Sequence, residues 1–169
     1  MKAKPIALGG VAAALAVVLL LLGGLIPVGT YVAPMLAALP LVALLYQLPT
    51  PLCIGWYTAV SILAVLLCPD KETAFVFVFL GWYPILRPRL DRLPPVLRLG
   101  LKLLIFNLAI AALYGMLIFV FQLDALVQEA RQTGRALLLV MLLLGNLCFL
   151  LFDVLLKRLA VYYSRKWYK

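Results

Sequence analysis

Long apolar segments separated by short joins dominate the chain, and each approaches the length of a helix that crosses a membrane. A helix spanning ~30 Å of hydrocarbon needs roughly 20 residues at about 1.5 Å per residue. Six stretches fit this pattern, at residues 5–26, 30–48, 52–68, 73–86, 99–121 and 136–156. They leave no room for a separate soluble domain. The pattern therefore predicts a single all-α domain, an integral membrane bundle of about six transmembrane helices.

The joins between these segments predict how neighbouring helices meet. Residues 27–29 and 49–51 are short and uncharged, so we expect the first three helices to form a tight antiparallel set. Pro34 and Pro40 lie inside the second segment, where a missing backbone N–H predicts a kink or a local break. The polar stretch 122–135 has the spacing of a short surface helix.

Composition agrees with a membrane protein and argues against a soluble or nucleic-acid-binding one. Of the 169 residues, 67% are apolar and 12% are charged, which is too little polar surface for a soluble domain of this size. The net charge is +9, but Lys and Arg stand between apolar segments and form no basic stripe. We therefore expect no nucleic-acid partner.

The positions of the basic residues predict an orientation. With a cytoplasmic N-terminus and six spans, twelve of the fifteen basic residues fall inside, and only Lys71, Arg131 and Arg135 fall outside. This bias follows the positive-inside rule. We expect the N-terminus, the basic loop around residues 87–98 and the C-terminus to be cytoplasmic in a multi-pass cell (plasma) membrane protein. The first segment is too long for a signal peptide and is expected to be retained.

Catalytic and metal-binding chemistry is not indicated. The sequence has no His, so no Ser–His or Cys–His pair can form, and it has no Gly-rich phosphate loop. Cys53, Cys68 and Cys148 lie in or beside apolar segments without a C-x-x-C spacing, as buried thiols do. We expect no enzyme, no cofactor and no metal.

Small residues form a stripe on one face of the first helix, at Gly9, Ala12, Ala13 and Ala16. Steps of three and four keep these residues on one face, where another helix can approach closely. That helix is either one of this chain's own or belongs to a partner membrane subunit, and the stripe alone leaves both alternatives open.

Few polar residues lie inside the apolar segments, and each needs a partner there. Asp153 has Lys157 at i+4, which predicts a local ion pair at the interface; Lys102 can also reach Asp153 by its long stem. A proton relay is the alternative, but it would have neither a His nor a second carboxylate. In the expected topology the helices at 99–121 and 136–156 run antiparallel, and Asn107 and Asn146 lie at similar depth in them, so we expect the two amides to face each other or a shared partner.

Aromatic and amide groups in the outer half indicate a candidate ligand site. Tyr31, Tyr114 and Gln122, together with Asn107 and Asn146, form the candidate substrate-binding set. Such side chains suit a small, mostly apolar molecule.

The start of the chain carries a family resemblance. Lys2 and Lys4 precede the small-residue run Ala7 to Ala16, which is followed by Gly23-Gly24-Leu25-Ile26-Pro27-Val28-Gly29. This opening, with the length and six-span layout, resembles the substrate-binding S components of energy-coupling-factor (ECF) vitamin transporters. In that family, small residues at i and i+4 on the first helix face the coupling subunit. The pairs Ala12 and Ala16, or Gly9 and Ala13, match this spacing, whereas the first outer loop is much shorter than is usual for the family.

The sequence therefore leads to two alternative hypotheses about function. The resemblance implies a small-molecule (vitamin-like) binding subunit of an ECF-type uptake transporter, energised by separate coupling and ATPase subunits. The alternative is a non-transporting membrane module for assembly, regulation or lipid handling. In that alternative the basic loop and tail bind the anionic headgroups of membrane lipids.

The orientation gives a direct prediction. A cysteine at Asp91 should be labelled by a membrane-impermeant thiol reagent only from the cytoplasmic side, and a cysteine at Asp124 only from outside. The unsubstituted chain, with its three native cysteines, is the control. Exchanged labelling of the two positions would overturn the orientation.

Overall fold

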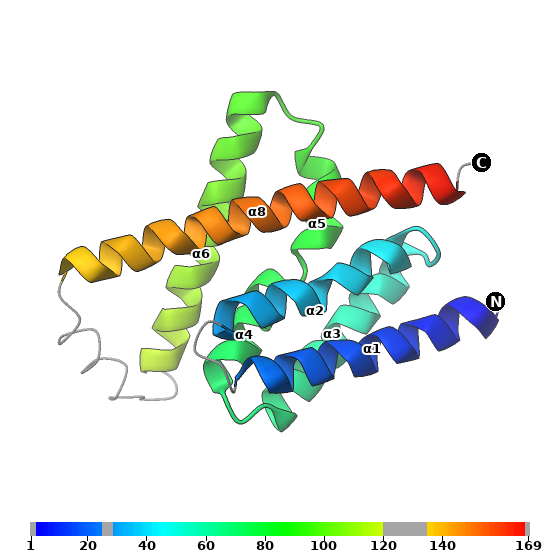
Figure 1. Cartoon of the computed structure of the whole chain (residues 1–169), viewed down its shortest axis with the longest axis horizontal. Coiled ribbons are helices and arrows are strands. Elements are labelled where there is room, and N and C mark those ends of the chain that lie inside the picture. Colours follow the sequence, from blue (N-terminus) through cyan, green and yellow to red (C-terminus); the bar gives the residue numbers. More distant parts are fainter. Residues whose placement is uncertain (1–2, 25–28, 120–134, 168–169) are drawn as a thin grey trace.

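The computed structural model describes residues 3–24, 29–119 and 135–167, and every regular element in them is a helix (Figure 1). The helices are α1 (Ala3–Gly23), α2 (Gly29–Leu45), α3 (Thr50–Leu67), α4 (Lys71–Leu80), α5 (Tyr83–Leu90), α6 (Pro95–Phe119) and α8 (Arg135–Trp167). The all-α prediction is confirmed for these residues. The predicted surface helix at 122–135 falls almost entirely outside them.

Three helices are long and apolar enough to cross a membrane, through Ile6–Gly23 in α1, Thr50–Leu67 in α3 and Pro95–Ile118 in α6. The apolar helix α2 is shorter, at 17 residues. Large apolar side chains also cover the outside of these helices: Val11, Leu66 and Leu108 are each about two-thirds exposed or more. Large apolar side chains exposed in this number are typical of contact with lipid or another apolar partner.

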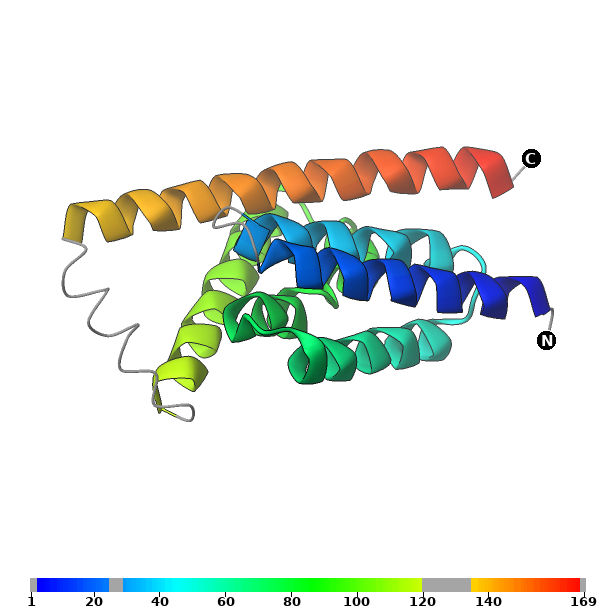
Figure 2. The same ribbon diagram turned by 60° about the horizontal axis from the view of Figure 1, so that its bottom comes forward.

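The first three helices lie side by side along a common direction, as Figures 1 and 2 both show. Glycines permit the close approach of α1 and α2 at their join. A Cβ on Gly23 would overlap the Cβ of Ala33, and a Cβ on Gly29 would overlap the carbonyl oxygen of Gly23. The indole Nε1 of Trp56 on α3 donates to the carbonyl oxygen of Gly9 on α1 at 2.9 Å. The expected tight set of three helices is present.

The segment from Thr73 to Leu86, expected as one short span, instead contributes to two short helices, α4 and α5. Pro84 has no N–H with which to continue the hydrogen bonds of α4, and it occupies the first turn of α5. At the break, a Cβ on Gly81 would lie 2.6 Å from the carbonyl oxygen of Phe77. Glycine and proline together therefore end one helix and begin the next.

Two other helices differ from the expected ones. Pro34 and Pro40 both lie inside α2 without ending it, so the second segment forms one helix. The last helix, α8, has 33 residues and is about 50 Å long at 1.5 Å per residue. It exceeds the predicted span 136–156 because the basic, aromatic tail continues the same helix.

Helix α6 crosses α8 steeply, and does not run antiparallel beside it as the sequence suggested (Figures 1 and 2). At the crossing, the rings of Phe106 and Phe149 stack with their centroids 4.9 Å apart. Gly145 presents no side chain there, and an added Cβ would already meet the Phe106 ring at 3.4 Å. The two described chain ends, at α1 and α8, lie at the same end of the molecule.

Candidate functional site

Four charged side chains from α5, α6 and α8 form a closed ring of alternating charge. Arg87 contacts Asp91 at 3.0 Å and Asp153 at 2.9 Å, and Lys102 contacts the same two carboxylates at 2.9 and 2.8 Å. We call Arg87, Asp91, Lys102 and Asp153 the charge ring. With two cations and two carboxylates, it has no net charge.

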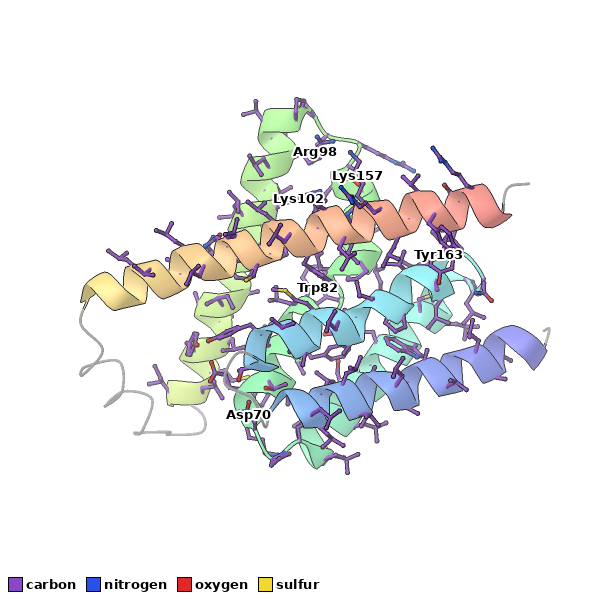
Figure 3. All side chains as sticks on the ribbon, in the orientation of Figure 1. Asp70, Trp82, Arg98, Lys102, Lys157 and Tyr163 are labelled. Carbon is purple, nitrogen blue, oxygen red and sulfur yellow. The ribbon has the colours of Figure 1, made fainter. Side chains whose placement is uncertain are left out.

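The charge ring is largely shielded from the surroundings. The side chains of Arg87 and Lys102 are 6% and 5% exposed, that of Asp153 15% and that of Asp91 31%. The Tyr83 hydroxyl adds a hydrogen bond to Asp153 Oδ1 at 2.7 Å. Buried charges are tolerated only when they are paired and hydrogen-bonded. The neutral, closed arrangement therefore explains how these groups lie among apolar helices, beside α8 (Figure 3).

The expected ion pair between Asp153 and Lys157 is wrong. The carboxylate of Asp153 instead bonds to Arg87, Lys102 and Tyr83, while Lys157 is exposed. The largely buried carboxylate points to the three interior donors, and the i+4 lysine stays at the surface. The predicted reach of Lys102 to Asp153 is confirmed.

Arg87 and Tyr83 were not predicted as partners of Asp153. The one local signal was the i, i+4 spacing of Arg87 and Asp91, which form a pair at the end of α5. The approach of α5 to α8 joins residues 66 positions apart, which no local pattern indicates.

Asn107 and Asn146 face each other where α6 crosses α8, as predicted. Asn107 Nδ2 donates to Asn146 Oδ1 at 2.9 Å, and the reciprocal bond is 3.3 Å. Each amide nitrogen also donates to the carbonyl four residues earlier, on Leu103 and Leu142, at 2.8 Å. Both N–H groups of each amide are thus used within the protein, which favours a structural role over ligand binding.

A second polar cluster joins α2, α4 and α6. The hydroxyls of Tyr31 and Tyr114 both donate to Glu72 Oε1, at 2.8 and 2.6 Å, and the two hydroxyls also contact each other. The sequence identified both tyrosines but missed Glu72, which follows the Asp70 cap in the first turn of α4. The fifth candidate, Gln122, lies outside the described residues.

The small-residue stripe on α1 packs inside the protein. Ala16 is fully buried, Gly9 and Ala12 are buried, and Ala13 is partly buried against the same core. The exposed face of α1 carries large apolar residues such as Val11. This geometry favours the first alternative, packing against the chain's own helices.

A cavity of about 380 Å³ lies where α2, α5 and α8 meet. Its lining consists of Val42, Leu45, Tyr46, Thr50, Pro84, Ile85, Arg87, Pro88, Arg89, Arg92, Leu156 and Ala160. Arg89 and Arg92 are exposed, and neither side chain forms an ion pair with the residues that the structure describes. The sequence placed these arginines in a basic loop, but not beside a cavity.

Comparison of the chain with family models, curated proteins and solved structures returns no match. Within residues 3–24, 29–119 and 135–167, no three His, Cys, Asp or Glu side chains gather as a metal site would require. The geometry of the clusters and of the cavity therefore carries the functional argument.

The amide pair gives a quantitative prediction. Asn107→Leu should lower the free energy of unfolding by only about 0.6 kcal/mol, the average for a hydrogen bond between membrane helices. Asn146→Leu is the matched variant and should behave alike, as measured by denaturant titration in detergent micelles. A loss of several kcal/mol from either variant would contradict a purely structural pair.

Proposed function

We propose that this protein is a multi-pass, non-enzymatic module of the cell membrane that handles lipid and binds anionic headgroups at its cytoplasmic end. The proposed layout has six spans, with α4 and α5 together as the fourth and residues 136–156 of α8 as the last. Three long apolar helices and the position of both chain ends at one end of the molecule support it, whereas the steep crossing of α6 and α8 counts against both of them as upright spans. An even number of crossings returns the chain to the side on which it began.

The observation that carries this proposal is the unpaired positive charge in the wall of a partly apolar cavity. Arg89 and Arg92 line that cavity. On α8, the exposed residues Lys157 and Arg158 lie between the lining residues Leu156 and Ala160 in the sequence. Basic residues next to a cytoplasmic leaflet are attracted to anionic lipid by about 1 kcal/mol each. The same residues follow the positive-inside rule in the proposed orientation.

The uptake-subunit hypothesis has less support. It calls for a free small-residue face on the first helix, and Ala12 and Ala16 are buried against the chain's own helices. It also calls for an open ligand site, and Tyr31, Tyr114 and the amide pair bond to groups of this chain. An uptake subunit that works with coupling and ATPase subunits and binds a vitamin-like ligand is therefore the second proposal.

Purification in mild detergent separates the two proposals. Lipid handling predicts that the purified protein carries anionic phospholipid at a higher fraction than the membrane it came from, measured by lipid mass spectrometry. A membrane protein of similar size without a basic loop is the control for carry-over. Bound lipid of the same composition as the bulk membrane, or stoichiometric ATPase subunits with a bound small molecule, would contradict lipid handling.

A further inference from the structure

The walls of the cavity between α2, α5 and α8 have two chemically different parts. Leu45 from α2, Ile85 from α5 and Ala160 from α8 give an accessible apolar side, and Arg89 and Arg92 give a cationic side. Val42 and Leu156 lie behind the apolar side and are buried. Its volume of about 380 Å³ falls within the ~300–1,000 Å³ of ordinary ligand sites. A ligand that matches both parts carries an anionic group next to a hydrocarbon chain.

Aromatic contacts hold the apolar side in place. The hydroxyl of Tyr46, just after α2, donates to the carbonyl oxygen of Ala160 on α8 at 3.0 Å. The ring of Tyr46 also stacks on that of Tyr163, with centroids 6.2 Å apart, and Figure 3 shows Tyr163 reaching from α8 toward the end of α2. The cavity is therefore framed by fixed contacts between α2 and α8.

The charge ring leaves the cationic side unneutralised. Asp91 lies between Arg89 and Arg92 in the sequence, but its two carboxylate oxygens bond to Arg87 and Lys102. The backbone N–H of Arg92 donates to the carbonyl oxygen of Arg89 at 3.3 Å. This turn keeps the backbones of the two arginines close in space. Two guanidinium groups are thus available, and guanidinium groups bind phosphate oxygens in bidentate pairs.

We infer that this cavity binds the phosphate group of one anionic phospholipid, with Arg89 and Arg92 on the phosphate and the start of an acyl chain against Leu45 and Ala160. This inference rests on the proposed function, to which it adds the site and the stoichiometry. A lipid fits better than a soluble phosphate because half of the lining is apolar and continues onto membrane-length apolar helices. The cavity is too small to hold a whole two-chain lipid, so the remaining hydrocarbon stays in the bilayer.

The experiment uses the full chain in nanodiscs of phosphatidylcholine with a minor fraction of phosphatidylglycerol. After release into mild detergent, native mass spectrometry counts the phosphatidylglycerol molecules that each protein retains. Arg89→Gln and Arg92→Gln should each reduce retention of a single phosphatidylglycerol by about tenfold, the loss expected for one charge-assisted contact. Ala160→Leu should reduce it as well, by filling the cavity without a change in charge.

A matched control removes the same charge outside the cavity lining, with Arg98→Gln. An equal loss from the control and the cavity variants, or no loss from Ala160→Leu, would overturn the site while leaving general lipid binding in place. The absence of any preference for phosphatidylglycerol in the unsubstituted protein would overturn the proposed function as well. Displacement of the lipid by millimolar inorganic phosphate alone would assign the cavity to a soluble anion and overturn the lipid assignment. Unchanged melting temperatures confirm that each variant is folded.

Discussion

The charge ring of Arg87, Asp91, Lys102 and Asp153 is the interaction on which one end of this molecule depends. Three members come from the end of α5 and from α6, which are consecutive in the chain, and the fourth comes from α8, with Asp153 51 positions after Lys102. Each cation contacts both carboxylates, so the removal of any one member leaves an imbalance in a largely buried place. The ring thereby fixes α5 against α8, which in turn sets the position of the cavity and of its two exposed arginines.

Polar contacts elsewhere in the protein follow the same physical logic. Helices that meet in an apolar environment gain little from further apolar burial, so packing and hydrogen bonds have to define their relative positions. The Asn107–Asn146 pair defines the point at which α6 crosses α8. At another contact, Glu72 ties α4 to Tyr31 of α2 and Tyr114 of α6. The charge ring, the amide pair and the Glu72 cluster each join residues that are between 39 and 66 positions apart in the sequence.

Much of the fold could be predicted from the sequence because segment length and apolar content decide where membrane-length helices form. The amide pair was also predictable, since depth along two apolar segments can be counted and an unpaired amide is costly there. The partner of Asp153 was not, because Lys157 at i+4 is a plausible local choice and the position of α5 is set by long-range contacts. The break between α4 and α5 was visible only as Gly81 and Pro84, which flank Trp82 and Tyr83, aromatic residues that suit a membrane interface. The cavity could not be predicted, because it depends on how three separate helices come together.

The central claim is that the charge ring acts as one unit, and a double-mutant cycle between Lys102 and Asp153 tests it most directly. Lys102→Met, Asp153→Leu and the double variant would be compared by their free energies of unfolding in the same detergent, with Lys157→Met as the surface control. Each single substitution should cost about 3–5 kcal/mol, because it leaves a buried charge without its partner. The double variant retains the neutral Arg87–Asp91 pair, so it should cost less than the sum of the singles by about 0.5–3 kcal/mol. Additive costs, or single substitutions no more harmful than Lys157→Met, would contradict the account.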